Sequence, residues 1–343
     1  MAKGLRILVV TSEWPTPAHP GYVPYLVQEV ACLGRAGVEV DVFAFRGRKN
    51  PLRYLWAWMR LRRRLARARY DVVHAHFGQS GVVALGAPAP LVVTFHGSDL
   101  HGIVGRRGRG TAAGWVLRRV SGFVARRADA VVVVSPHMAA LLPPGVHCEV
   151  VPSGVDFRRF APAPRDAARR RLGLPDGVPL ALFAGAPGDP VKRHALAAEV
   201  VRRVRLRRPL EMVVLDGVPH AEVPHYLNAC DLLLVTSAHE GSPTAVKEAL
   251  ACGLPVVSVD VGDVARRLAG VEGCHLCAGG TAGELARAVT AVLERRGRVD
   301  GRAAVADVGA EALALRLARL YARLAGRPAD QRTPVLAGHG PTA

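Results

Sequence analysis

The chain has 343 residues, of which 50% are hydrophobic, and its 46 Lys and Arg outnumber 28 Asp and Glu to give a net charge of +18. This length and composition exclude a fibrous or disordered protein and predict two globular domains of ordinary size. Residues 1–157 hold 20 basic and nine acidic residues, so we expect this half to attract an anionic partner.

The six cysteines are scattered through apolar segments, which predicts reduced thiols in an intracellular protein. The N-terminus shows no secretory signal pattern, and no apolar stretch reaches the length needed to cross a bilayer. We therefore expect a cytoplasmic protein that is soluble or peripheral on the inner face of the cell membrane.

Short β-branched runs alternate with helix-length segments along the chain. In the first half the runs lie at residues 5–10, 38–45, 71–76, 91–95, 129–134 and 149–151. Such continuous apolar runs are typical of parallel strands that are buried on both faces. A segment rich in Pro, Gly and Arg interrupts the pattern at 151–179, and the runs restart at 180–185, 210–217, 231–237 and 254–260.

This alternation predicts an α/β fold with two Rossmann-like, doubly wound domains, at residues 1–157 and 158–326. One long helix is expected over residues 302–325, and residues 327–343 are expected to form a flexible tail.

The run at 231–237 leads into a helix start with an acidic residue on either side, Glu240 and Glu248. We expect Ser242 to cap this helix, Pro243 to occupy its first position, and the amides from Thr244 onward to form an anion site. The two carboxylates would accept hydrogen bonds from hydroxyls on either side of a bound diphosphate. Local physics alone favours a plainer interpretation, because capped helices with nearby acids are common in α/β proteins.

The stretch EGSPTAVKEALACGLPVVS, residues 240–258, resembles the E-x₇-E signature of retaining glycosyltransferase family 4, the group 1 glycosyltransferases. Residues 12–43, 70–78, 92–100 and 150–160 resemble further landmarks of that family. The resemblance implies the GT-B fold, in which two domains face a cleft and a C-terminal helix returns towards the N-terminal domain. It also implies that residues 1–157 bind the acceptor and residues 158–326 bind a nucleotide sugar.

The resemblance assigns Glu240 to hydroxyls of the transferred sugar and Glu248 to those of the ribose, and it places His96 beside the sugar. The remaining donor-binding residues that it implies are Gly21, Gly185, Gly241, Ser242, Pro243 and Thr244.

Two departures from the family pattern concern the glycines and the cations. The first loop offers only Gly21 where two glycines are usual, and Ala186 stands where an arginine is expected. A cation must stabilise the diphosphate as the glycosidic bond breaks. We assign that role to Lys192 together with Arg193, and we expect Lys247 to be a solvated surface residue.

No Asp-x-Asp pair is present, so we expect a metal-independent enzyme with no cofactor besides the nucleoside-diphosphate sugar. The resemblance implies transfer of a hexose with retention of configuration to a glycan or lipid-linked acceptor, in cell-surface polysaccharide or glycoconjugate synthesis. We also expect His74 and His76 to face opposite sides of their strand and therefore not to share a metal ion.

Residues 52–69 form a basic amphipathic pattern, with Tyr54, Trp58, Leu61 and Leu65 on one stripe. The segment from Arg60 to Arg69 would suit an anionic membrane surface, although such a stripe more often packs on the core. Further arginines at 106–110, 118–119 and 126–127 favour an anionic or lipid-linked acceptor.

Two other functions fit parts of the sequence. A nonhydrolysing nucleotide-sugar epimerase would share the paired domains, but its catalytic acids and histidines cannot be placed. A non-catalytic polyanion-binding protein would suit the charge, but no RNA-binding motif or aromatic stacking face is present, so we expect no nucleic-acid partner.

Overall fold

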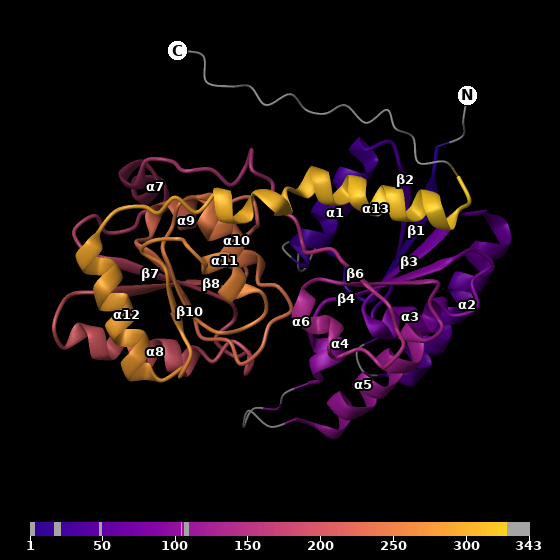
Figure 1. Cartoon of the computed structure of the whole chain (residues 1–343), viewed down its shortest axis with the longest axis horizontal. Helices are drawn as coiled ribbons and strands as arrows, with labels where there is room; N and C mark the ends of the chain where they lie inside the picture. The colour runs from indigo at the N-terminus through magenta and orange to yellow at the C-terminus, as the bar shows by residue number, and fades with distance from the viewer. Residues whose placement is uncertain (1–3, 17–21, 48–49, 104, 106–109, 328–343) are drawn as a thin grey trace, which may run out of the picture.

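The computed structural model describes residues 4–16, 22–47, 50–103, 105 and 110–327. Two parallel β-sheets, one in each half of the chain, are surrounded by helices (Figure 1). The predicted tail lies outside the described residues except for Arg327, and the domain boundaries at 157 and 326 remain predictions.

The first sheet has six strands in the order β2-β1-β3-β4-β5-β6. Its strands are β1 (Arg6–Thr11), β2 (Glu39–Ala44), β3 (Val72–His76), β4 (Leu91–Phe95), β5 (Ala130–Val133) and β6 (Glu149–Val150). Every residue of β3 and β4 is buried, as expected for central parallel strands covered on both faces. The helices of this half are α1 (Pro24–Arg35), α2 (Pro51–Arg67), α3 (Gly78–Ala84), α4 (Ser98–His101), α5 (Ala112–Ala125) and α6 (Pro136–Ala139).

The second sheet has five strands in the order β11-β10-β9-β7-β8. Its strands are β7 (Leu180–Ala184), β8 (Glu211–Leu215), β9 (Leu232–Val235), β10 (Val256–Val259) and β11 (His275–Cys277). The helices are α7 (Arg165–Leu172), α8 (His194–Arg205), α9 (Val223–Ala229), α10 (Thr244–Ala251), α11 (Val264–Leu268), α12 (Ala282–Arg295) and α13 (Ala310–Leu324), with a 3₁₀ helix at Ala303–Val308.

The strand order reverses at the same point in both sheets. β1 lies between β2 and β3, and β7 lies between β8 and β9. In open α/β sheets, ligands bind beyond the carboxyl ends of the strands at such a reversal. The segments after β7 and β9 are therefore where a ligand of the second half is expected.

The C-terminal helix returns to the N-terminal half, as predicted. α13 packs against α1, and the buried Tyr321 hydroxyl lies 2.6 Å from Nδ1 of His74 in β3. Figure 1 shows α13 alongside α1, above the first sheet. This crossing joins the apolar residues of the two halves, because Leu317 of α13 and Leu33 of α1 belong to one buried cluster.

The single helix predicted over 302–325 is interrupted. The 3₁₀ helix ends at Val308 and α13 begins at Ala310, with Gly309 between them paired to Val155. The Val155 amide donates to the Val308 carbonyl at 2.8 Å, and the Ala310 amide donates to the Val155 carbonyl at 2.9 Å. The Ala310 amide, which donates to Val155, does not also donate to a carbonyl four residues earlier, so a new helix begins at this point.

Candidate active site

An ion pair joins the segments that follow β7 and β9. Nζ of Lys192 lies 2.7 Å from Oε1 of Glu240, and the hydroxyl of Ser237 donates to the same carboxylate oxygen at 2.8 Å. The Lys192 stem lies over Gly185, where an added Cβ would come within 2.8 Å of the lysine Cγ. Two predicted site residues are thus brought together, and Gly185 leaves room for them.

Arg193 does not join this pair. Its guanidinium donates to the backbone carbonyls of Thr236 and Ser237, and its own backbone is left-handed with φ of 51°. These bonds hold the segment after β9 in place, which is a structural role. Ala186 is exposed in the loop that follows β7. Of the two cations proposed for the diphosphate, Lys192 is therefore the one that remains available.

The backbones of the two halves meet at His96 and Gly241. A Cβ atom added to Gly241 would lie only 2.1 Å from the His96 carbonyl oxygen, so this approach requires glycine. Gly97 next to it has φ of 142°, a conformation that side chains disfavour. The Ser135 hydroxyl also donates to the Gly241 carbonyl at 2.5 Å. His96 and Glu240, predicted to contact one sugar, therefore stand on neighbouring backbone segments.

His96 ends a chain of polar groups that runs into the first half. Its Nε2 lies 3.0 Å from Nδ1 of His76, whose Nε2 lies 3.2 Å from a carboxylate oxygen of Glu29. Burial lowers the pKa of both imidazoles to about 3, so both are neutral at pH 7. Nε2 of His76 and Oε1 of Glu29 approach each other without forming a hydrogen bond.

The expectation that His74 and His76 face opposite sides is wrong, because residues two apart on a strand lie on the same face. Their ring centroids are 4.2 Å apart, and with Glu29 they bring potential ligand atoms within 4.8 Å of one another. However, both ring nitrogens of His74 are already bonded, Nδ1 to Tyr321 at 2.6 Å and Nε2 to Thr94 at 2.7 Å. His74 is therefore part of a buried hydrogen-bond network and has no free ring nitrogen for a metal ion.

The helix α10 does not begin as predicted. Pro243 is its N-cap residue, and Ser242 makes no capping hydrogen bond. The amide of Val246 donates to the Pro243 carbonyl at 3.2 Å, so it is not free for an anion. The amides of Thr244 and Ala245 stay at the positive end of the helix, where a phosphate group is favoured.

Lys247 is buried, which corrects the expectation of a solvated surface residue. Its side chain has 0% exposure, and Nζ donates to the Ser153 carbonyl at 2.7 Å and to the Ser242 hydroxyl at 2.9 Å. Burial lowers the pKa of Lys247 to about 8. The Ser242 hydroxyl, predicted to cap the helix, thus serves this lysine, and Lys247 ties α10 to the segment between the two halves.

Glu248 is buried in α10 and has a partner that sequence reasoning missed. Oε1 of Glu248 lies 2.7 Å from Nε2 of His220, which follows β8. The sequence could have indicated this partner, because β8 adjoins β7 and a titratable residue that follows β8 lies at the carboxyl edge of the sheet. His220 therefore helps to orient the carboxylate assigned to the ribose.

Two acids at the carboxyl edge of the first sheet were also missed. Glu13 follows β1, and burial together with Asp99 raises its pKa to about 7. Burial raises the pKa of Asp99 to about 6, although it accepts the backbone N–H groups of His96 and Gly97. Gly21, predicted in the same loop region, lies outside the described residues.

Residues 1–159 match the family model for Glycosyltransferase Family 4, and residues 181–295 match the model for Glycosyl transferases group 1. Together with the two facing parallel sheets, these matches define a glycosyltransferase of the GT-B fold. The chain belongs to the family 4, group 1 glycosyltransferases.

The relatives that match this chain include two bacterial glycosyltransferases. The putative teichuronic acid biosynthesis glycosyltransferase of Bacillus subtilis is 27% identical, over 76% of this chain and 82% of that protein. The D-inositol 3-phosphate glycosyltransferase of Geodermatophilus obscurus is 32% identical, over 66% of this chain and 60% of that protein.

Solved structures share the fold at low identity. The sucrose-phosphate synthase of Thermosynechococcus elongatus superimposes with a TM-score of 0.77 and 18% identity, covering 94% of this chain and 99% of that one. Anabaena HepE in complex with UDP-glucose has a TM-score of 0.60 and 19% identity, with 94% and 98% covered.

Proposed function

We propose that this glycosyltransferase moves a hexose from a nucleoside-diphosphate sugar to a glycan or lipid-linked acceptor, with retention of anomeric configuration. The observation that carries the proposal is the Lys192–Glu240 ion pair at the start of the E-x₇-E segment, beside His96 of the other half. HepE holds UDP-glucose, and the Bacillus relative is named for teichuronic acid biosynthesis, which supports a nucleotide-sugar donor and a role in cell-surface polysaccharide synthesis.

The donor would lie across the start of α10. Glu240 accepts hydrogen bonds from hydroxyls of the transferred sugar, and the buried Glu248 accepts those of the ribose. The diphosphate sits at the amides of Thr244 and Ala245, where the helix dipole favours negative charge. Lys192 then stabilises the charge that the diphosphate gains as the bond to the sugar breaks.

Transfer proceeds on one face of the sugar. The bond between the anomeric carbon and the diphosphate oxygen breaks, the acceptor oxygen bonds to the same face, and the acceptor proton passes to the leaving phosphate. No enzymatic nucleophile is needed, and Glu240 is a poor candidate for one because its Oε1 already accepts from Lys192 and Ser237. The lysine and the helix amides take the place of a metal ion in this proposal.

A panel of nucleotide sugars tests the proposal. The full chain is incubated with each donor and a membrane lipid extract, with and without EDTA, and nucleoside-diphosphate release is measured. We expect one donor to give release that depends on the acceptor and survives EDTA, and NMR of the product to show the configuration of the donor. Epimerisation of a donor in the absence of acceptor, or inversion in the product, would sink the proposal.

We further propose that α2 brings the protein to an anionic membrane surface. Among the described residues no helix is long and apolar enough to span a bilayer. Leu61 of α2 is buried in the core, whereas Trp58 of the predicted stripe is 41% exposed and Trp56 is 62% exposed beside the arginines. Exposed tryptophans among arginines favour an interfacial position. Flotation with anionic liposomes at low salt should carry the protein, and loss of flotation in Trp56→Gln should follow.

A further inference from the structure

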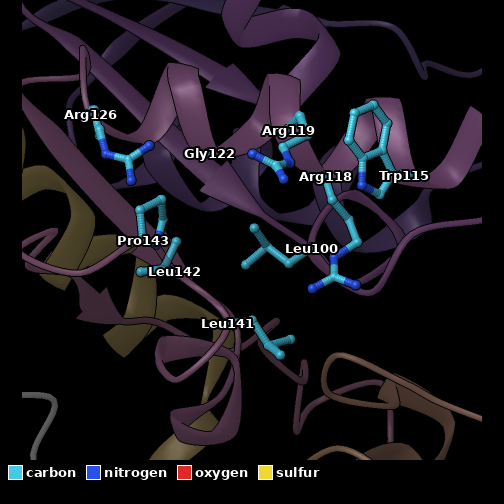
Figure 2. Close-up of a pocket in the computed structure, with 9 residues that line it drawn as sticks. All are labelled: Leu100, Trp115, Arg118, Arg119, Gly122, Arg126, Leu141, Leu142 and Pro143. Atoms are coloured by element: carbon cyan, nitrogen blue, oxygen red, sulfur yellow. The ribbon is translucent and has the colours of Figure 1, made fainter.

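A pocket lies in the N-terminal half, beside α5 (Figure 2). It has a volume of about 390 Å³ and is lined by Leu100, Trp115, Arg118, Arg119, Gly122, Arg126, Leu141, Leu142 and Pro143. Figure 2 shows the arginine side chains on the α5 side and the Leu and Pro side chains across from them. The pocket therefore has one cationic wall and one apolar wall.

Among the described residues, no carboxylate pairs with the arginines of the cationic wall. Arg118 and Arg119 of α5 and Arg126, which follows its last residue, all line the pocket, and none of them forms an ion pair with a carboxylate among the described residues. Residues 100–128 contain seven arginines and no Asp or Glu, and the flanking Asp99 and Asp129 accept hydrogen bonds from the backbone amides of Gly97 and Leu91. The Arg119 guanidinium lies 5.0 Å from the Trp115 ring, which orients its N–H groups without using them.

The apolar wall is fixed in place and keeps the pocket open. Leu100 and Leu142 are buried, and they present a fixed surface opposite the arginines. Gly122 lies on the α5 side, where a Cβ atom would come within 3.2 Å of Pro143. A larger residue there would narrow the pocket, so glycine preserves its depth. Such a combination suits an anion that is attached to an apolar chain.

The pocket adjoins the place where the two halves meet. Leu100 precedes His101, whose ring stacks on His239 at 5.0 Å, and His239 precedes Glu240. The Arg118 side chain lies beside the residue after His101, because a Cβ atom added to Gly102 would come within 3.3 Å of the Arg118 Cδ. The pocket therefore adjoins the loop that contacts the residue before Glu240 in the second half.

We infer that this pocket binds the phosphate or diphosphate group of a lipid-linked acceptor, an ester of an apolar alcohol. The inference rests on the proposed function for the transfer step, and it narrows the acceptor from any glycan to a phosphorylated amphiphile. Guanidinium groups match the geometry of phosphate oxygens, and the apolar wall takes the first carbons of the chain. Binding to the pocket needs no donor, so it is measured separately from transfer.

Calorimetric titration of the full chain with farnesyl diphosphate, inorganic diphosphate and farnesol tests the site. We expect farnesyl diphosphate to bind more tightly than either of the other two. Arg119→Gln and Arg126→Gln should each weaken its binding about tenfold or more, since each removes a charge-assisted hydrogen bond. Arg127→Gln is the matched control, because the Arg127 guanidinium lies 4.9 Å from the Phe123 ring and outside the pocket.

Lys192→Gln separates this pocket from the donor site, and it should leave the affinity for farnesyl diphosphate unchanged. Unchanged affinity in both pocket variants, or equal loss in Arg127→Gln, would overturn the inference. Equal affinity for inorganic and farnesyl diphosphate would overturn the lipid assignment in favour of a free phosphate ligand. A protein that binds farnesyl diphosphate through Arg119 but no nucleoside diphosphate would refute the proposed function and leave the pocket assignment standing.

Discussion

Replacing Lys192 by Met tests whether its ammonium stabilises the leaving diphosphate. Met keeps an unbranched stem over Gly185 and removes the charge that lies 2.7 Å from Glu240. Loss of one pre-organised group at a developing charge costs about 2.7–4 kcal/mol of transition-state stabilisation, which lowers kcat about 10²–10³-fold. The negative charge on the diphosphate grows during transfer, so we expect kcat to fall more than the KM for the donor rises.

A purely structural role for Lys192 predicts a different pattern. If the lysine only holds Glu240 in position, Lys192→Met should have no further effect once Glu240→Gln has removed the charge it holds. We expect instead that Lys192→Met lowers kcat at least about tenfold in the Glu240→Gln background as well. Steady-state nucleoside-diphosphate release measures both variants and their combination. Ser237→Ala is the control, because that hydroxyl bonds the same carboxylate oxygen without a charge. An effect that vanishes in the double variant would refute the catalytic assignment.

Three further predictions concern the fold and the donor site. The pKa of Lys247 is about 8 in the folded protein and 10.5 in the unfolded chain. Between these pH values the unfolded chain binds more protons than the folded protein, so the free energy of unfolding rises with pH. The free energy of unfolding, measured in urea relative to Lys247→Met, should rise by up to about 3 kcal/mol across this window; a flat difference contradicts the assignment. Gly241→Ala should abolish transfer and enlarge the radius of gyration in X-ray scattering, because the new Cβ meets the His96 carbonyl, whereas Gly188→Ala, with open space around it, should not. Glu248→Gln should weaken nucleoside-diphosphate binding about tenfold in calorimetry, and unchanged affinity would remove Glu248 from the ribose site.

Much of the fold follows from the pattern of apolar runs. Strands such as β3 and β4 are continuous apolar segments because both faces are covered, and that alone indicates parallel βαβ units. The break at Gly309 was not predictable, because it depends on pairing with Val155 more than 150 residues away in the chain. The burial of Lys247 was missed for a related reason, since its partner at Ser153 lies in another part of the chain.

The candidate site also contains residues that the sequence predicted and residues that it did not. Glu240 and Lys192 were placed by resemblance to a family, and the structure brings their side chains together. The chain from Glu29 through His76 to His96 has no sequence signature, because its members come from a helix, a strand and a loop that only the fold assembles. Sequence spacing predicts which residues lie close together on one helix or strand, but it does not predict contacts between different elements.

Ala186 stands where the resemblance implies an arginine, and this leaves the charge balance of the proposed site to other residues. Arg193 is bound to two carbonyls, so Lys192 is the cation that pairs with Glu240. Without a donor, each member of this pair satisfies the other. A diphosphate would draw Lys192 towards its oxygens, and the sugar hydroxyls would then replace the ammonium on Glu240. In this proposal donor binding would exchange one ion pair for two new contacts, and neither charge would be left without a partner in a partly buried site.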